Sequence, residues 1–344
     1  MGIQNFFKKI KELILADPFE KMAERIMTSV SLPEGETDVE NDERGVTYSK
    51  DGKWLVKAPT TLSGDYEVKE GCEMICDEAF YWCTSLNSVV LPQTIKALGD
   101  GAFSCCEKLH TIVLPDNLAL IGNRCFCHTD SMSLEKLPEN LRILGDYSLS
   151  GCKIVDTITI PENVSHIGIN PFACEGLKKI EVHKENKHFV AKDGVLYDAT
   201  LTELISFPRE HKGTILNIPQ SVKTIRNGVF DRCHNVKEII LPKKLVSIKD
   251  EAFSYCFSLT SITIPSGIKV LPWGTFKDCI SLKSVTLPST LETIEAEGFR
   301  GCSLLTTIDI PKSVLFVGNE AFAGCPMDKK KRKELSARFG ERIF

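Results

Sequence analysis

The chain has 344 residues, of which 42% are hydrophobic, so it carries enough apolar side chain for a folded core. Its 42 basic and 46 acidic residues give a net charge of −4, which provides no overall positive field for phosphate backbones, and we expect no nucleic-acid partner. No apolar run approaches the roughly 20 residues of a membrane helix, so we expect no membrane span.

Residues 1–30 are predicted to form an N-terminal helical segment. Apolar residues recur at helical spacing from Phe6 to Ile14, and Asp17-Pro18-Phe19-Glu20 has the cap, first-turn proline and acidic third position of a helix start. We expect this segment to cover the end of the following fold or to act as a separate docking piece. An amphipathic membrane helix is the alternative interpretation.

A secretory signal needs an uninterrupted apolar stretch of roughly 7 to 15 residues near the start of the chain. Charged residues such as Lys8, Lys11 and Asp17 interrupt every candidate stretch. The sequence therefore predicts a cytoplasmic protein, with the cell surface reached by a non-standard route as the alternative. Residues 31–46 are rich in Asp and Glu and poor in apolar side chains, which predicts an acidic, solvated linker.

A repeat of 23 residues occupies most of the remaining chain. An Ile-Pro or Leu-Pro step recurs, and successive prolines differ by 23 residues except between Pro161 and Pro219, where an insertion of 35 residues intervenes. The prolines are Pro92, Pro115, Pro138, Pro161, Pro219, Pro242, Pro265, Pro288 and Pro311. The same frame, without its proline, begins at Lys69, so we predict ten coils.

Other positions keep the same step. Aliphatic residues follow each proline after three and six residues, a large apolar residue after eleven and usually a cysteine after fourteen, as in Ile268, Leu271, Phe276 and Cys279 after Pro265. A coil of 23 residues is too short to bury its own apolar face. The coils must therefore stack on one another. We expect the phenylalanines of adjacent coils, such as Phe253, Phe276 and Phe299, to be buried.

The six residues before each proline have the Leu-x-x-Ile-x-Ile pattern of a short strand with alternate residues inside, as in Leu259–Ile264. We predict that these strands form one narrow parallel sheet, which proline ends because it cannot donate to the ladder. The Ala-Phe-x-x-Cys stretch across the coil is predicted to form a short helical or 3-10 turn.

The insertion, at about 184–218, is predicted to fold as a small sheet built on a hairpin that continues the stack. Asp193-Gly194 lies between alternating apolar residues, which is a strong hairpin signal, and Asp51-Gly52 before the first coil repeats it. The third coil departs from the pattern at Thr129 and Glu135, and Cys174 arrives one residue early. We expect a local kink or an altered coil there.

These residues resemble the BspA-type leucine-rich repeats of bacterial and protozoan proteins, whose hallmark IPxSVxxIxxxxFxxCxxLxxI is repeated here over about residues 47–326. The stretch that begins at Phe189 also resembles a module found between such repeats. The resemblance implies an α/β, right-handed leucine-rich-repeat solenoid. It also implies a binding role, since members of the family are typically surface proteins or adhesins.

The 14 cysteines are interpreted mainly as free thiols packed in the core, because they recur in one inward frame of a long chain. Cys105, Cys127 and His128 form the strongest candidate for metal or redox chemistry, because His128 lies one repeat after Cys105. Zinc needs about four converging ligands, so ordinary turn residues are the favoured interpretation. We expect no cofactor and no catalytic residue.

Residues 327–344 are predicted to form a basic C-terminal cap helix. Five consecutive cations, residues 329–333, precede Leu335 and Phe339 at helical spacing. A nuclear address is the alternative for this run.

We predict a non-enzymatic scaffold that binds a protein through the solvent side of the strands. A surface-exposed adhesin for host protein or glycan is the alternative. An enzyme, a metal-binding protein or an ice-ordering surface are more distant hypotheses. The candidate binding residues are the outward strand positions Asn87, His110, Thr111, Asp156, Thr157, Thr159, Lys237, Glu238, Thr260, Thr263, Lys283, Thr286, Thr306 and Asp309.

Overall fold

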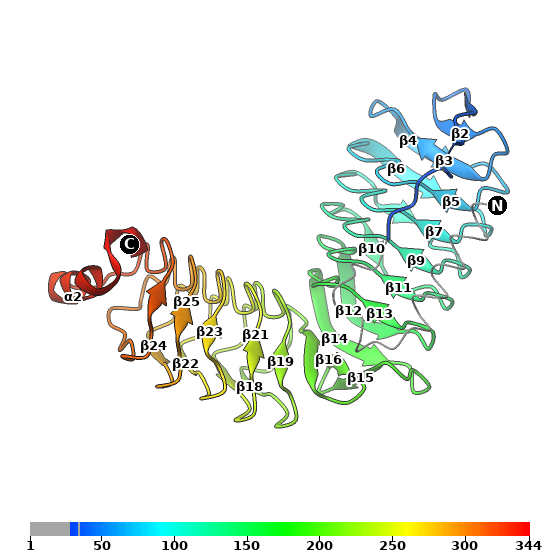
Figure 1. The fold of residues 1–344 in the computed structure, drawn as a ribbon. Helices are drawn as coiled ribbons and strands as arrows, with labels where there is room; N and C mark the ends of the chain where they lie inside the picture. Colours follow the sequence, from blue (N-terminus) through cyan, green and yellow to red (C-terminus); the bar gives the residue numbers. More distant parts are fainter. Residues whose placement is uncertain (1–27, 34) are drawn as a thin grey trace. The chain divides into compact units, whose positions relative to one another are not determined.

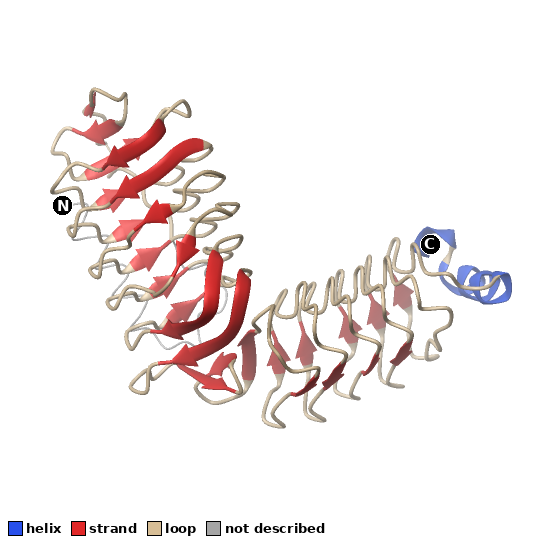
Figure 2. Ribbon diagram, turned by 180° about the vertical axis from the view of Figure 1, so that it is seen from behind, coloured by secondary structure: helices blue, strands red, loops and turns tan. Residues whose placement is uncertain are grey.

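A computed structural model describes residues 28–33 and 35–344. The helices expected within residues 1–27 lie outside the described part of the chain. The described residues form two compact units, one made of residues up to 175 together with 182–188, and the other of residues 176–181 and 189–344. Both units are stacks of short-stranded coils, as Figures 1 and 2 show.

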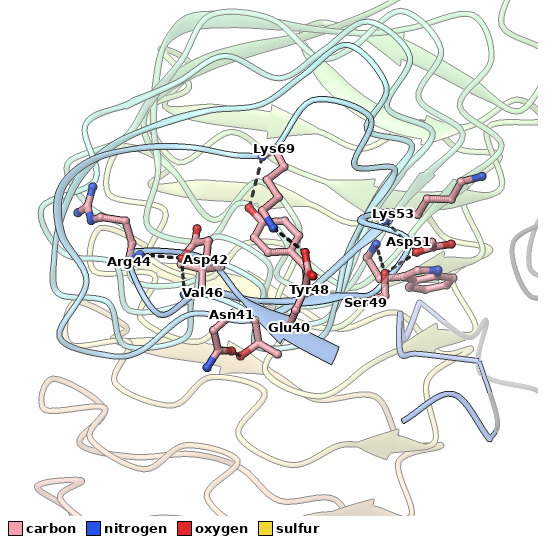
Figure 3. Close-up of polar contacts among 12 residues, drawn as sticks. Glu40, Asn41, Asp42, Arg44, Val46, Tyr48, Ser49, Asp51, Lys53 and Lys69 are labelled. Carbon is pink, nitrogen blue, oxygen red and sulfur yellow. Dashed lines mark hydrogen bonds and ion pairs between the residues drawn. The ribbon is translucent and has the colours of Figure 1, made fainter. Parts of the chain in front are cut away.

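Unit 1 begins with an antiparallel meander. Strands β1 (Val39–Asn41), β2 (Thr47–Ser49) and β3 (Trp54–Lys57) pair in that order. The carboxylate of Asp42 accepts the N–H groups of Arg44 and Val46 at 2.9 and 2.8 Å and fixes the first turn (Figure 3). The second turn contains Gly52 with a φ of 72°, so the hairpin predicted at Asp51-Gly52 is confirmed.

The segment 31–46, which we expected to be a solvated linker, therefore contains strand β1. Its charged side chains are partly tied to the first coils: Glu40 pairs with Lys69 at 3.1 Å, and Asp42 accepts the hydroxyl of Tyr66 at 2.6 Å. Composition alone misses this strand, because all three β1 side chains face solvent and leave no apolar alternation.

Each coil of unit 1 contributes two strands, where we expected one. The strands before the proline frame are β4 (Ser63–Glu67), β6 (Ser85–Val90), β8 (Thr111–Ile112), β10 (Ser133–Leu134) and β12 (Lys153–Ile160). The strands after it are β5 (Met74–Ile75), β7 (Ala97–Leu98), β9 (Leu120–Ile121), β11 (Ile143–Leu144) and β13 (His166–Ile167). We call them the pre-proline and post-proline strands.

Unit 2 opens with the insertion. Strands β15 (Phe189–Lys192) and β16 (Val195–Asp198) form the hairpin predicted around Asp193-Gly194, and β17 (Glu203–Ser206) pairs antiparallel with β16. Strand β17 also pairs parallel with β19 (Thr224–Ile225) of the next coil. The predicted small sheet that continues the stack is thus confirmed. Strand β14 (Glu175–Val182) precedes it.

The later coils of unit 2 repeat the two-strand plan. The pre-proline strands are β18 (Ile215–Asn217), β20 (Glu238–Ile240), β22 (Ser261–Thr263) and β24 (Ser284–Thr286), paired parallel in that order. The remaining post-proline strands are β21 (Ser247–Ile248), β23 (Val270–Leu271), β25 (Thr293–Ile294) and β26 (Phe316–Val317).

The Ala-Phe-x-x-Cys stretch is a series of turns and not a continuous helix. In the coil of Phe253, the N–H of Ser254 donates to Glu251 at 3.0 Å, three residues back, as in a 3-10 turn. The N–H of Phe253, however, donates to Thr275 of the next coil at 3.0 Å. Glu251 and Tyr255 have φ values of 54° and 53°, which no right-handed helix contains. Coil-to-coil bonding therefore replaces helical bonding here.

Stacked phenyl rings run through the core of each unit. The rings of Phe253 and Phe276 are 5.2 Å apart and within 9° of parallel, and Phe276 and Phe299 are 5.4 Å apart. All three side chains are completely buried, as predicted.

Buried cysteines line the same core. The thiols of Cys279 and Cys302 donate to the carbonyls of Phe253 and Phe276 at 3.0 and 3.1 Å, each 26 residues earlier in the chain. At the irregular third coil, Thr129 is buried and donates to Phe103 at 2.8 Å in the same way. Cys174, one residue early, still donates to Leu149 at 3.0 Å. The core positions expected to be disturbed thus retain their hydrogen bond.

The end of unit 2 is covered by helix α2 (Lys329–Phe339) and the 3-10 turn η1 (Glu341–Ile343). Phe344 lies 6.2 Å from the ring of Phe322, and the N–H of Phe322 donates to Ile343 at 2.7 Å, so the last residues occupy the place of a further coil. No helix in the described ranges is long and apolar enough to cross a membrane.

Replacing Phe276 with alanine should lower the free energy of unfolding by roughly 3 to 5 kcal/mol, because it leaves a cavity between two stacked rings. Urea denaturation monitored by circular dichroism measures this. The exposed Thr286→Ala change is the control and should cost little. An unchanged midpoint for Phe276→Ala would contradict the assigned frame.

Trypsin should cleave the native protein slowly at Lys192. This residue is exposed but paired with Val195 in the hairpin, and a protease needs an extended, unpaired segment. A time course resolved by mass spectrometry tests the expectation. Cleavage at Lys192 as fast as in a denatured sample would show that the insertion is an open loop.

Cys105 should react fastest with Ellman's reagent in the native protein and Cys127 next, because burial raises the pKa of the Cys127 thiol. Cys105 and Cys127 are half-buried, and the other twelve cysteines are buried. Burial also raises the pKa of Cys72 to about 11 and of Cys76 to about 12, so these thiolates are scarce at pH 8. All fourteen should react in guanidinium chloride. Fast reaction of more than two native thiols would contradict the buried ladder.

Candidate binding surface

The pre-proline strands of unit 2 alternate strictly between core and solvent. Leu216, Ile239, Ile262 and Val285 point into the core, and their neighbours on both sides are exposed. Parallel pairing places Ser261 beside Ser284 and Thr263 beside Thr286. Hydroxyl groups therefore cover the coils of β22 and β24, whereas β18 and β20 present the exposed apolar side chains of Ile215 and Ile240.

The rows extend one residue before the strands. The N–H groups of Lys237, Thr260 and Lys283 donate to the carbonyls of Thr214, Lys237 and Thr260 at 2.8 to 3.1 Å, which places the three side chains in one line. Among the described residues, Lys237, Glu238 and Lys283 have no ion-pair partner, and all three are exposed. Their charges are therefore available to another molecule.

The structure places every candidate residue on this side of its coil. All are exposed except Asn87 and Thr157, which are half-buried. Thr306 and Asp309 follow the frame but lie outside any strand, beyond β24. Asp309 also lies 4.0 Å from Lys331, which makes it less available than Lys237.

On the equivalent face of unit 1, polar side chains form hydrogen bonds with one another. His110 contacts the hydroxyl of Thr111 at 2.8 Å, and Ser88 donates to Asp65 at 2.6 Å. Asp156 has a φ of 71° and accepts a bond from Thr157 at 3.3 Å. Several polar groups of this face thus bind one another, so the unit 2 face is the stronger candidate.

An aromatic rim borders the unit 2 face, and the sequence interpretation missed it. The rings of His234 and Phe257 stack at 5.4 Å, Tyr255 meets Phe257 edge-on at 6.1 Å, and Arg232 lies 5.6 Å from the ring of Tyr255. These residues follow or flank the repeated cysteine, and Ile280, 46% exposed, takes the position of Phe257 in the next coil. The signal was an apolar residue directly after the cysteine in two adjacent coils.

The opposite outer face, over the post-proline strands, is covered in unit 1. Val30 lies in a buried cluster with the outward side chains of Met74, Ala97, Leu120 and Ile143, and Leu32 packs against that cluster. In unit 2, the corresponding residues Thr224, Ser247 and Thr293 are polar and partly exposed, and Val270 and Phe316 are apolar and exposed.

An acidic ladder holds the covering segment of unit 1. Asp77 accepts the N–H groups of Val30 and Asp100, both at 2.7 Å, and it also binds the hydroxyl of Ser29. The carboxylate of Asp100 likewise accepts the N–H of Asn123 at 2.7 Å. Cys76 precedes Asp77, but glycine precedes Asp100 and Asn123, because a Cβ there would meet the ladder residue of the preceding coil: on Gly122 it would lie 2.7 Å from an oxygen of Asp100.

The geometry at Cys105, Cys127 and His128 is that of turn residues. The N–H of Cys105 donates to Cys127 at 2.8 Å, and the N–H of His128 donates to Ser150 at 3.1 Å, so both belong to the coil-to-coil ladder. Within residues 28–33 and 35–344, no three His, Cys, Asp or Glu side chains are placed to hold a metal ion.

Solved structures of bacterial leucine-rich repeat proteins share this fold. A leucine-rich cell surface protein of Faecalibacterium prausnitzii is 24% identical, with a TM-score of 0.71 over 88% of this chain and 97% of that one. A leucine-rich repeat protein of Eubacterium ventriosum is 24% identical, with a TM-score of 0.58 over 77% and 83%. The pneumococcal vaccine antigen PcpA is 17% identical, with a TM-score of 0.50 over 84% and 98%.

A comparison with curated protein sequences gave no match. The family model described as the BspA type leucine rich repeat region matches six copies over residues 73–194 and 206–328. These ranges cover well over half of the sequence and contain the stacked phenylalanines and the thiol ladder described above. The chain therefore belongs to the BspA-type leucine-rich repeat family.

Proposed function

We propose that the protein is a non-enzymatic scaffold that binds a partner protein through the pre-proline face of unit 2. The observation that carries the proposal is the row of exposed charges at Lys237, Glu238 and Lys283, which have no ion-pair partner among the described residues. Thr260 lies between Lys237 and Lys283 in this row, and Thr263 is exposed on the same face at the end of β22.

The backbone supports this role because strand pairing already holds it in a fixed conformation. Strands β20 and β22 pair on both sides and β18 and β24 on one side, and the buried Ile239, Ile262 and Val285 anchor β20, β22 and β24 to the core. A partner would meet a rigid surface and would cause little loss of conformational freedom on binding. A standard interface buries about 800 Å² on each partner, so the partner must span several coils.

The aromatic rim supplies anchors that a hydroxyl face lacks. Binding energy is concentrated in a few aromatic and arginine residues, and Tyr255, Phe257 and Arg232 lie at the edge of the hydroxyl array. Lys237 and Glu238, two neighbouring charges of opposite sign, would set orientation and association rate. This combination supports a protein partner in preference to a glycan, which remains the alternative ligand.

We propose a cytoplasmic location, supported by the twelve buried cysteine thiols. The name of the Faecalibacterium prausnitzii protein, which places that protein on the cell surface, supports the alternative of a surface adhesin. Immunoblots of fractionated cells, with and without external protease, separate the two.

Lys237→Glu, Glu238→Lys and Thr263→Tyr together should weaken binding at least tenfold, a loss of about 1.4 kcal/mol, without lowering the thermal midpoint. The assay is quantitative pull-down of a partner captured by the wild-type full chain. A matched control variant, Lys244→Glu with Glu162→Lys and Ser289→Tyr, changes exposed residues that follow the prolines and should bind normally. Equal binding by both variants would place the interface elsewhere.

A further inference from the structure

The end of unit 2 is strongly cationic in a chain that is acidic overall. Residues 328–344 carry seven Lys and Arg against three Asp and Glu, whereas the whole chain has a net charge of −4. Lys329, Lys330 and Lys333 are exposed on α2, and within the described residues none of the three has an ion-pair partner. Lys331 alone of the lysines is bound, to Glu334 at 3.1 Å.

The position of these cations opposes helix stability. The first turn of α2 contains no acidic residue, although the partial positive charge at a helix N-terminus favours acidic side chains there. Asp328 compensates only in part, by accepting the N–H of Lys331 at 2.7 Å. A local arrangement that costs stability indicates a role outside folding.

Two exposed apolar side chains lie in the last coil, next to Val314, whose carbonyl accepts a bond from Arg338 of α2. Leu315 is 83% exposed, the highest value among the large apolar residues of the described chain, and Phe316 is 46% exposed. The guanidinium of Arg342 lies 5.4 Å from the ring of Phe316. Arginine and large apolar groups are thus presented together.

The helix is fixed on this end of the stack. Arg338 donates to the carbonyls of Ile310, Pro311 and Val314 at 3.1, 2.7 and 2.7 Å, directly before Leu315. Leu335 and Ile343 are buried against the last coil. Helix α2 and the C-terminus lie together beyond the final strands (Figure 1). We call α2, η1, Leu315 and Phe316 the end surface.

We propose that the end surface binds the face of an anionic phospholipid bilayer. The cations of α2 would contact lipid phosphates and carboxylates, and each would add to the free energy of membrane binding. Leu315 and Phe316 would enter the interfacial layer of the bilayer. A hydrated polyanion such as nucleic acid would use the cations but would give the exposed apolar pair no role. The pair therefore favours the membrane.

The test is sedimentation of the full chain with vesicles of phosphatidylcholine, with and without about 30% phosphatidylserine, a fraction that gives a surface potential typical of an anionic leaflet. We expect binding only to the anionic vesicles. Lys329→Glu, Lys330→Glu and Lys333→Glu together should reduce the partition coefficient on the order of a hundredfold. The control variant Lys243→Glu, Lys244→Glu and Lys249→Glu has the same net charge, changes exposed residues of other coils and should bind nearly as wild type.

The apolar pair separates a membrane from other polyanions. Leu315→Ser with Phe316→Ser should weaken vesicle binding about tenfold and leave retention on heparin unchanged. The proposal would be overturned if the double serine variant bound vesicles as well as the wild type. It would also be overturned if the two charge-reversed variants lost vesicle binding equally. Absence of binding to anionic vesicles would do the same. Thermal midpoints of all variants confirm that each is folded.

Discussion

The structure depends on the fact that no coil is complete without its neighbour. The N–H of Phe253 is satisfied by a carbonyl of the next coil, and its own carbonyl accepts the thiol of Cys279 from that same coil. Its ring is buried only because Phe230 and Phe276 cover its two faces at 5.2 Å. Backbone bonds, thiols and rings therefore all repeat at the same step of 23 residues, and each coil relies on its neighbour for all three kinds of contact. The two ends need covers for the same reason.

The sequence predicts the features that repeat inside the core. The step of 23 residues identifies Phe276 and its neighbours as buried, since a large apolar residue in one frame of every coil has no other explanation in a stack. Thr129 shows the limit of matching residue types. It was interpreted as a departure from the pattern, yet its hydroxyl makes the bond that the cysteine thiol makes elsewhere. The frame needs a small buried donor, which two residue types can supply.

Features set by backbone conformation were harder to predict. The post-proline strands are only two residues long, and strands such as Leu120–Ile121 and Thr224–Ile225 show no alternation over so short a span. The turns resemble a helix in spacing, but Glu251 and Tyr255 occupy left-handed positions that glycine takes in other coils, at Gly274 and Gly301. The covered outer face left a partial signal, because Met74, Ala97, Leu120 and Ile143 are apolar in consecutive coils, whereas unit 2 alternates Ser247 and Thr293 with Val270 and Phe316. A strand that is buried on both faces should be apolar throughout.

The same dependence explains why the proposed interface lies on the strand face. Stacking constrains inward side chains and backbone groups, but it places no demand on outward positions, so Lys237, Thr260 and Lys283 can differ while their backbone pairing stays the same. Chemistry on that face can vary at little cost in stability, and each side chain is held at a fixed spacing from the next by the sheet. The face of unit 1 shows the opposite use of this freedom, since His110 binds Thr111 and Ser88 binds Asp65. One repeated scaffold thus carries a face on which some polar side chains bond to one another and a face whose charges at Lys237, Glu238 and Lys283 have no ion-pair partner among the described residues.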